Sequence, residues 1–337
     1  MTAAVTMGHG GPEQIEVRDD WLRPHVGPGQ ALVRVTAAAV NNTDIWSRQG
    51  AYGTTADPDA IVGWKGVPLD FPRIQGIDIA GEVVTVDANV DRSWVGKRVI
   101  VDPAAVYAGD YPTHIVGSEL DGGFAQYHVC GVSQLHDVTA SPLTDAQLSC
   151  LPTAYGTALG MLNRAGCSAG ERVLVTGASG GVGMAAVQLL LARDCIVIAR
   201  TSAARRRQIA ELGVAEVSVR GLDEVSELEH VDAVLDVVGG DEFGLIIDRL
   251  RDGGRIVTAG AIGGPVVAFD IRRLYLHQRT LIGSTMHTPA DFAELAAIAV
   301  AGNLEPLVAA SYPLSEIAAA QARLLAKDFV GKLVLEP

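Results

Sequence analysis

The pattern of apolar and polar residues divides the chain into two parts with different periods. In the first part, apolar and polar residues alternate over 31–40, 79–86 and 97–101, and Gly and Pro clusters separate these stretches. Alternation with a period of two is typical of strands with one buried face. We therefore predict a β-rich, loop-rich domain for this part of the chain.

From about residue 170, short β-branched runs alternate with longer segments of helical period. Such an order needs right-handed crossovers and gives a parallel sheet that is covered on both faces. We therefore predict a doubly wound α/β domain over 152–287. Its expected strands lie at 172–176, 195–199, 231–237 and 255–258, and its expected helices include 182–193 and 203–212.

The C-terminal stretch carries two Ala-rich helical segments, 290–301 and 314–326, and an apolar end, 331–335. We expect this stretch to return to the first domain. The predicted organisation is therefore a discontinuous β-rich domain over 1–151 and 288–337, interrupted by the α/β domain.

Composition and charge narrow the class of protein. With 337 residues and 48% apolar residues, the chain is long enough for two domains with buried cores. Its 26 Lys and Arg against 39 Asp and Glu give a formal net charge of −13, which argues against a nucleic acid as partner.

The sequence also indicates a compartment. No apolar run approaches the ~18 residues that a membrane-spanning helix needs, and residues 1–11 do not resemble a signal peptide. The cysteines Cys130, Cys150, Cys167 and Cys195 are far apart, so we expect free thiols in a reducing environment. We therefore expect a cytoplasmic protein without a membrane partner.

A glycine-rich turn follows the predicted strand 172–176 and leads into the predicted helix 182–193. Small residues at such a turn let the backbone approach a pyrophosphate, and the helix start offers free N–H groups. We predict a dinucleotide site here; the alternative is a tight turn that serves only helix packing. The expected contacts are Gly177, Ser179, Gly180, Gly181, Val182 and Gly183.

The end of the second α/β strand bears on which dinucleotide binds. An NAD site usually places an acidic residue there, whereas a 2′-phosphate needs cations and hydroxyl donors. No acid occurs between Cys195 and Ala210, where the chain instead carries Arg200, Thr201, Ser202 and Arg205. We predict NADP(H) as cofactor and leave open which arginine holds the phosphate. The alternative is a solvated basic helix face.

Several motifs occur in order along nearly the whole chain. They are Asn41-Asn-Thr43-Asp44, Pro72-Arg-Ile-Gln-Gly76-Ile-Asp78, Val95-Gly96-Lys97-Arg98-Val99, Gly122-Gly-Phe-Ala-Gln-Tyr127, the glycine turn, and Gly331-Lys332-Leu-Val-Leu335. In these motifs the chain resembles the medium-chain dehydrogenase/reductases. The resemblance implies an α/β fold with a GroES-like β-rich catalytic domain, a Rossmann domain with a doubly wound parallel sheet, and an active site in the cleft between them.

Two positions indicate whether the chain can bind the catalytic zinc of this family. The zinc-dependent members of this family carry a Cys where this chain has Asn41 and a His where it has Ile77. Neither residue here suits a tetrahedral N/S site. The chain is thus similar to the zinc-free, quinone oxidoreductase-like branch, which implies NADPH and no metal. An alternative metal trio is His128, Cys130 and His136, although such residues more often serve packing.

The resemblance also assigns candidate catalytic residues. It places Asn41 beside nicotinamide and substrate, with a structural amide as the alternative role. Thr43 matches a hydroxyl that relays a proton, or else caps the turn at Asp44. Tyr52 matches a pocket tyrosine whose phenol donates to a developing oxyanion, or else only covers the cleft.

Further residues are expected at the cofactor or beside the catalytic cluster. Asp78 is expected to hold backbone N–H groups or an arginine, and Cys150 to be a small buried hydrophobe. Lys332 is expected to reach the cleft or to lie on the surface. The other expected cofactor contacts are Thr153, Thr157, Val238, Gly239, Ala259 and Gly260.

The sequence thus predicts a zinc-independent, NADPH-dependent oxidoreductase that transfers hydride to a quinone, an enone, a 2-alkenal or a related activated carbonyl compound. Two alternatives stay open: a zinc-independent alcohol dehydrogenase or carbonyl reductase, and a non-catalytic nucleotide-binding protein of the crystallin or sensor kind. The resemblance also implies a homodimer that pairs through the last Rossmann strand, 280–284.

Overall fold

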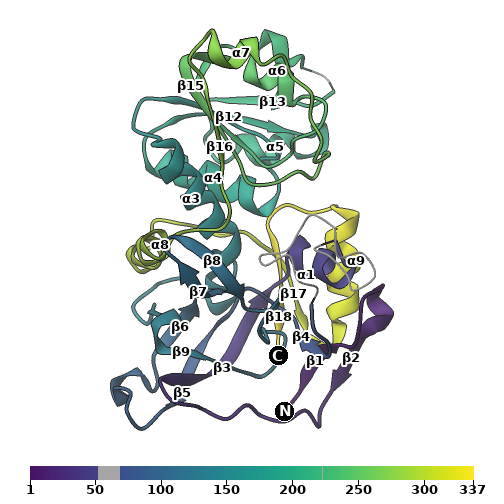
Figure 1. Ribbon diagram of the computed structural model, residues 1–337, viewed down its shortest axis with the longest axis vertical. Coiled ribbons are helices and arrows are strands. Elements are labelled where there is room, and N and C mark those ends of the chain that lie inside the picture. The colour runs from purple at the N-terminus through teal and green to yellow at the C-terminus, as the bar shows by residue number, and fades with distance from the viewer. Residues whose placement is uncertain (52–68, 222) are drawn as a thin grey trace. The chain divides into compact units, whose positions relative to one another are not determined.

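The computed structural model describes residues 1–51, 69–221 and 223–337, and the chain forms two compact units. Met1–Thr153 and Thr288–Pro337 form the first, which we call the β-rich unit. Ala154–His287 form the second, which we call the α/β unit (Figure 1). The chain therefore leaves the first unit once and returns to it for its last fifty residues.

The β-rich unit is built on a seven-stranded sheet in the order β10-β6-β5-β3-β18-β17, with β9 also pairing with β3. A three-stranded sheet, β2-β1-β4, and the hairpin β7-β8 complete it. The strands are β1 (Ala3–Thr6), β2 (Ile15–Arg18), β3 (Gln30–Ala39), β4 (Arg73–Ile74), β5 (Ala80–Val86), β6 (Arg98–Val101), β7 (Ala104–Ala108), β8 (Tyr111–Ile115), β9 (Tyr127–Gly131), β10 (Leu135–Asp137), β17 (Val308–Pro313) and β18 (Lys332–Glu336).

Strand β3 is central to this unit because it joins the N-terminal and C-terminal segments. Its apolar residues Val33 and Val35 are buried in the main core cluster, which also contains Phe124 and Leu335. The end of β3 pairs antiparallel with β18 through Ala39 and Val334. This pairing brings Lys332, the first residue of β18, to the segment that follows β3.

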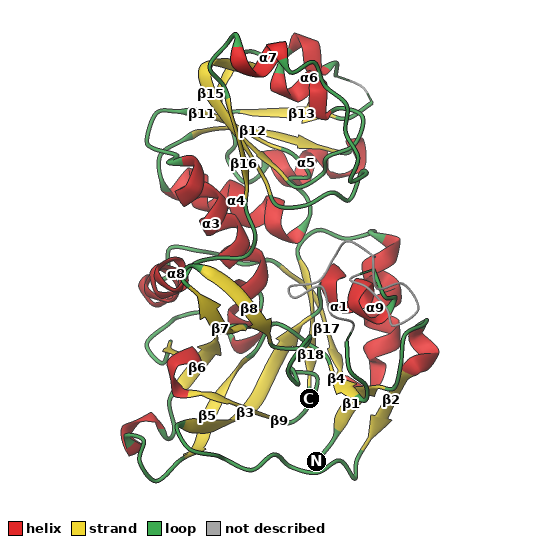
Figure 2. Cartoon of the chain, in the orientation of Figure 1, coloured by secondary structure: helices red, strands yellow, loops and turns green. Residues whose placement is uncertain are grey.

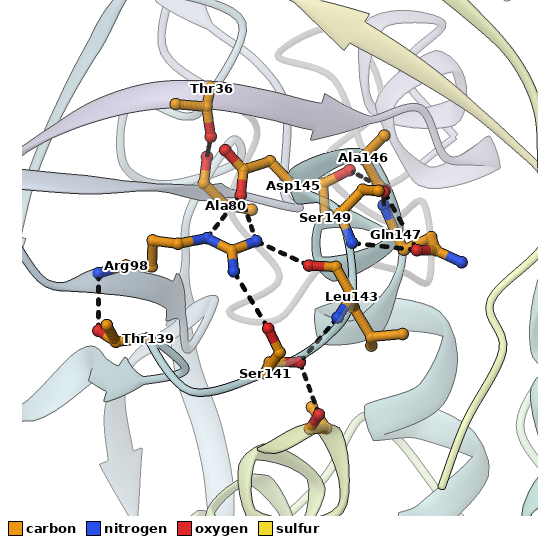
Figure 3. Close-up of polar contacts among 12 residues, drawn as sticks. Thr36, Ala80, Arg98, Thr139, Ser141, Leu143, Asp145, Ala146, Gln147 and Ser149 are labelled. Atoms are coloured by element: carbon orange, nitrogen blue, oxygen red, sulfur yellow. Dashed lines mark hydrogen bonds and ion pairs between the residues drawn. The ribbon is translucent and has the colours of Figure 1, made fainter. Parts of the chain in front are cut away.

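An arginine holds the chain segment that leads to the candidate site (Figure 3). Arg98 on β6 donates from Nε to Asp145 Oδ1 at 2.9 Å and from a terminal nitrogen to the carbonyl of Leu143 at 2.8 Å. Asp145 begins helix α2 (Asp145–Ser149), and the hydroxyl of Ser141 donates to the carbonyl of Ala299 at 2.6 Å. These bonds fix the loop and helix that precede Cys150 and Thr153.

The other helices of the β-rich unit are α1 (Asn42–Arg48), α8 (Pro289–Ala301) and α9 (Ile317–Ala326). In α8, Thr288 caps the start, since its hydroxyl accepts from the N–H of Asp291 at 3.1 Å. Gly302, with φ of +73°, ends α8 in the left-handed conformation that favours glycine. The two Ala-rich helices expected at the C-terminal end are therefore present.

The α/β unit is a six-stranded parallel sheet in the order β13-β12-β11-β14-β15-β16. Its strand order runs outward from β11 to β13 and then restarts on the other side with β14, which is the doubly wound arrangement. The predicted Rossmann fold is confirmed. The strands are β11 (Arg172–Val175), β12 (Ile196–Thr201), β13 (Glu216–Val219), β14 (Val231–Asp236), β15 (Leu250–Thr258) and β16 (Thr280–Gly283).

Helices cover this sheet (Figure 2). Helix α4 packs against β12, α5 against β13, and α3 and α6 against β15. The predicted helix over 203–212 is wrong in its extent, because a 3₁₀ turn over Ala203–Arg205 precedes only a short α5. The helices are α3 (Gly156–Ala165), α4 (Gly181–Ala192), α5 (Arg206–Ala210), α6 (Phe243–Ile247) and α7 (Arg272–Tyr275).

Within residues 1–51, 69–221 and 223–337, no helix is long and apolar enough to cross a bilayer.

Candidate active site and cofactor site

A cluster of buried and half-buried polar side chains lies where β3 ends, α1 begins and β18 starts. Asn41 precedes α1, and its N–H donates to Asp44 Oδ2 at 2.7 Å. Its side-chain Nδ2 donates to Asp78 Oδ2 at 2.9 Å and to the carbonyl of Ala39 at 3.3 Å. The side-chain amide of Asn41 therefore joins the end of β3 to the segment that carries Asp78.

Lys332 supplies the positive charge of this cluster. Its ammonium donates to Asp78 Oδ2 at 3.1 Å and to the side-chain oxygen of Asn41. The Lys332 side chain is 8% exposed and that of Asp78 is 0% exposed. The other oxygen of Asp78 accepts the N–H of Thr153 at 2.7 Å. We call Asn41, Asp44, Asp78 and Lys332 the Asp78 cluster.

The expectation for Asp78 thus holds for the backbone N–H group, while its cation is a lysine rather than an arginine. Lys332 lies within this cluster and not on the surface. Burial of such an ion pair is costly, and the mutual attraction of the two groups and their further hydrogen bonds offset that cost. The cluster is therefore a fixed cation held by a fixed carboxylate.

Asp44 is the second carboxyl group of the cluster and is almost wholly buried. Burial, with a smaller contribution from the negative charge of Asp78, raises the pKa of Asp44 to about 7, although the hydrogen bond from the Asn41 N–H and the charge of Lys332 oppose this rise. Two carboxyl groups therefore share one ammonium, and Asp44 takes up a proton near neutral pH.

This shift predicts a pH-dependent stability. Between about pH 4 and pH 7 the folded chain keeps a proton on Asp44 that the unfolded chain releases, so rising pH lowers the free energy of unfolding in this window. The expected loss is about 4 kcal/mol from this group, with little change above the window. Urea unfolding of the wild type and of Asp44→Asn from pH 4 to 8 measures this dependence. The asparagine is neutral throughout, so the free energy of unfolding of the variant should fall less steeply with pH. The same dependence on pH in both proteins would contradict the prediction.

The residues of this corner do not fit a catalytic zinc. Ile77, at one zinc-ligand position, is buried hydrocarbon, and the oxygen of Asn41, at the other, accepts from Lys332. Cys150 is buried, its thiol donates to the carbonyl of Ala146 at 3.2 Å, and burial raises its pKa to about 12. A neutral thiol is a poor zinc ligand. Cys150 instead packs with Ala37, Ala39 and Val334, as a small hydrophobe.

In the alternative metal trio, the thiol has the same difficulty. Burial raises the pKa of Cys130 to about 12, so this thiol stays neutral, whereas burial lowers the pKa of His128 to about 4. The ring of His136 packs edge-on against Phe292, with ring centroids 4.8 Å apart. Among the residues that the structure describes, no three His, Cys, Asp or Glu side chains come together as a metal site.

The glycine turn of the α/β unit joins β11 to α4, and its glycines differ in what the fold requires of them. Gly177 has φ of +59°, and a Cβ at Gly183 would lie 2.2 Å from the carbonyl oxygen of Gly177, so both positions need glycine for the fold itself. Gly180 differs: its φ is −82° and a Cβ there would meet no atom closer than 3.4 Å. The fold does not require glycine at this position, which fits a backbone that a bound group approaches.

The first turn of α4 adds hydrogen-bond donors to this turn. No side chain caps the helix at Gly180, so the N–H groups of Gly181, Val182 and Gly183 lie at an open helix start. Such a helix start, with a positive dipole end, binds phosphate groups. The residues of this turn therefore fit the pyrophosphate of a dinucleotide.

Other predicted cofactor residues lie at the same carboxyl edge of the sheet. Val238 and Gly239 follow β14, and Ala259 and Gly260 follow β15. Asp236 fixes the edge: it accepts from the Thr176 hydroxyl at 2.6 Å and from the Gly239 N–H at 3.0 Å. The strand order reverses between β11 and β14, and this is where doubly wound sheets bind ligands.

The predicted 2′-phosphate residues do not share one environment. Arg200 is 4% exposed, and its guanidinium is bonded to Glu242 and Ser218 inside the α/β unit. Ser202 and Arg205 are half-buried after β12. The Thr201 side chain is also buried, so Ser202 and Arg205 are the more accessible of the four. A further arginine, Arg220, is exposed beside this segment, and its N–H donates to the carbonyl of Thr201 at 2.8 Å.

Three of the remaining candidate residues lie on helical segments. Thr43 is half-buried in the first turn of α1, and Thr157 is buried in α3. Thr153 lies in a short π-helical stretch, Leu151–Tyr155, a feature that often marks functional sites. Its hydroxyl is buried without a hydrogen-bond partner among the described residues. Tyr52 lies outside the described residues.

Comparison with known proteins agrees with this architecture. Residues 27–140 match the model of the alcohol dehydrogenase GroES-like domain, and residues 181–301 match that of the zinc-binding dehydrogenases. The zinc in the latter name does not fit the donor set described above.

Individual relatives cover the whole chain. A solved structure from Sinorhizobium meliloti 1021, assigned provisionally as an alcohol dehydrogenase, is 42% identical, with a TM-score of 0.93 over 100% of this chain and 96% of that one. The acryloyl-coenzyme A reductase of Metallosphaera sedula is 29% identical over 99% of both chains. Human quinone oxidoreductase is 26% identical over 99% of this chain and 97% of its own.

A GroES-like domain joined to a Rossmann domain defines a class of two-domain oxidoreductases. This chain belongs to the medium-chain dehydrogenase/reductase superfamily, whose members depend on nicotinamide dinucleotides. The predicted fold class and the family resemblance are thus confirmed.

Proposed function

We propose that the protein is a zinc-independent, NADPH-dependent oxidoreductase that reduces quinones or alkenes activated by a carbonyl group. The observation that carries the proposal is the Lys332 ammonium, which hydrogen-bonds Asn41 and Asp78 in the corner where zinc-dependent relatives hold their metal. The similarity to an acryloyl-coenzyme A reductase and a quinone oxidoreductase supports the substrate class.

The cofactor would be held by the glycine turn, by the α4 start, and by Ser202 and Arg205 at its 2′-phosphate. When bound, the nicotinamide dinucleotide supplies the hydride. This chain's own residues then stabilise the negative charge that develops on the substrate oxygen. Lys332, kept charged and oriented by Asp78, supplies the positive field, and Asn41 fixes its direction.

Protons are handled by hydroxyl groups in this proposal. Thr43, in the first turn of α1, is the expected relay, and Tyr52 is the expected donor to the substrate oxygen. Neither group needs a metal, because a hydroxyl within hydrogen-bond reach transfers a proton directly.

Paired substrates test the reaction class. The proposal predicts NADPH oxidation with a 1,4-quinone or a 2-alkenal and much slower oxidation with the corresponding saturated ketone or aldehyde. The 42% identical relative, provisionally an alcohol dehydrogenase, favours carbonyl reduction as the second candidate. Faster turnover of the saturated compounds would support that second function and reject the first.

A homodimer is the expected assembly, formed through the edge of the Rossmann sheet. β16 is the last strand of the sheet, and Leu281 on it is 41% exposed. Ile271, Tyr275 and Leu276 are also exposed in the segment before it. Pairing of two β16 strands would cover this apolar edge. Light scattering should give twice the chain mass, and Leu281→Lys the mass of one chain; a monomeric wild type would refute the assembly.

A further inference from the structure

An ion pair occupies the carboxyl end of β12, where Rossmann domains select their cofactor. The Arg200 guanidinium faces the Glu242 carboxylate side by side: Nε lies 2.9 Å from Oε2 and one terminal nitrogen 2.7 Å from Oε1. The other terminal nitrogen donates to the Ser218 hydroxyl at 2.6 Å and to the carbonyl of Asp223 at 3.3 Å. Arg200 is thus held from three different segments.

The hydrogen bonds of Arg200 within the α/β unit use most of its N–H groups. A guanidinium has five N–H groups, and four of them are directed at Glu242, Ser218 and Asp223. Binding a phosphate in the two-pronged manner that arginine favours requires two parallel N–H groups. Arg200 cannot offer these while Glu242 holds the same edge of the guanidinium. The hydrogen bond from Arg200 keeps the pKa of Glu242 below its ordinary value, so Glu242 is ionised. The negative charge of Glu242 therefore offsets the positive charge of Arg200.

We infer that Glu242 is a specificity-determining residue: it withholds Arg200 from the 2′-phosphate and so limits the preference for NADPH over NADH. The inference rests on the proposed function, since it concerns the cofactor named there. The Glu242 side chain is 32% exposed and that of Arg200 only 4%, so the acid is the solvent-facing member of the pair. A 2′-phosphate that approaches β12 therefore meets a carboxylate before it meets this arginine.

The substitution Glu242→Gln tests the inference by binding rather than by turnover. Calorimetric titration with NADP⁺ and NAD⁺ should show NADP⁺ binding roughly tenfold tighter than in the wild type, because an ionic hydrogen bond becomes available to the phosphate. NAD⁺ binding should stay within about twofold, since NAD⁺ lacks the group concerned. Unchanged NAD⁺ binding also reports that the α/β unit is folded.

Two further variants complete the experiment. Glu229→Gln removes the same charge from a carboxylate that pairs with Arg172 at the start of β11, and it should leave both affinities unchanged. Arg200→Gln combined with Glu242→Gln replaces the ion pair by two neutral amides, so neither charge of the pair is left without its partner. This double variant should bind NADP⁺ within about threefold of the wild type, because the pair contributes no net charge in either case.

The outcomes separate the inference from the proposed function. NADP⁺ affinity that does not rise in Glu242→Gln would overturn the inference, and so would a gain that persists in the double variant, because Arg200 would then not be its source. A tenfold loss of NADP⁺ affinity in the double variant would also overturn the inference, because Arg200 would then already bind the 2′-phosphate in the wild type. Wild-type protein that binds neither dinucleotide would overturn the proposed function together with the inference.

Discussion

Replacing Lys332 by methionine is expected to lower the free energy of unfolding by about 3–5 kcal/mol and hydride transfer by about 100-fold. The stability loss follows because Asp78 is wholly buried and would lose the cation that compensates its carboxyl group. The loss of activity follows from the proposal that this ammonium stabilises the substrate oxygen. Urea unfolding measures the first effect, and NADPH oxidation with a saturating 2-alkenal at constant fraction folded measures the second.

A second lysine provides the control for Lys332. Lys97 pairs with Asp137 at 2.8 Å, but both side chains are more than a third exposed. Lys97→Met is therefore expected to cost less than about 1 kcal/mol and to leave turnover unchanged. If Lys332→Met resembled Lys97→Met in both measurements, Lys332 would have neither a structural nor an electrostatic role in the site.

Replacing Gly183 by alanine is expected to weaken dinucleotide binding by more than tenfold and to destabilise the α/β unit by about 1–3 kcal/mol. The added Cβ would lie 2.2 Å from the carbonyl oxygen and 2.7 Å from the carbonyl carbon of Gly177. Both are backbone atoms, so the turn and the helix start must move apart. Calorimetric titration with NADP⁺ and thermal unfolding measure the two effects.

Gly180→Ala separates an effect on cofactor binding from an effect on the fold. A Cβ at Gly180 has room in the protein, and φ there is one that alanine adopts readily. The unfolding midpoint of this variant should match the wild type while NADP⁺ binding falls, since the new methyl group occupies the space where the pyrophosphate approaches. NADP⁺ binding that is normal in both variants would show that the glycine turn does not hold the cofactor.

The sequence predicted the sheet and the cofactor turn because both have local signals. The strand, glycine turn and helix over 172–192 are contiguous, and buried strands such as β11 are short β-branched runs. β13 was missed because it has only four residues, Glu216–Val219, two of them polar. The first half of β15 was missed because Arg251-Asp-Gly-Gly254 reads as a turn.

The candidate site was less predictable, because its contacts join distant segments. Lys332 meets Asn41 and Asp78 only through the pairing of β18 with β3, which no local pattern reveals. Arg200 looked like a phosphate contact, since its partner Glu242 is 42 residues away in the sequence. The residue types were therefore readable from the sequence, but which charges neutralise each other was decided by the fold.

The central claim is that hydride transfer in this protein needs the Lys332 ammonium and no metal. The most direct measurement is the zinc content of the purified protein by mass spectrometry, before and after dialysis against a strong chelator, together with the rate of NADPH oxidation by a quinone or 2-alkenal. We expect substoichiometric zinc and an unchanged rate after chelation. One zinc per chain, with turnover lost on its removal and restored on its return, would contradict the account.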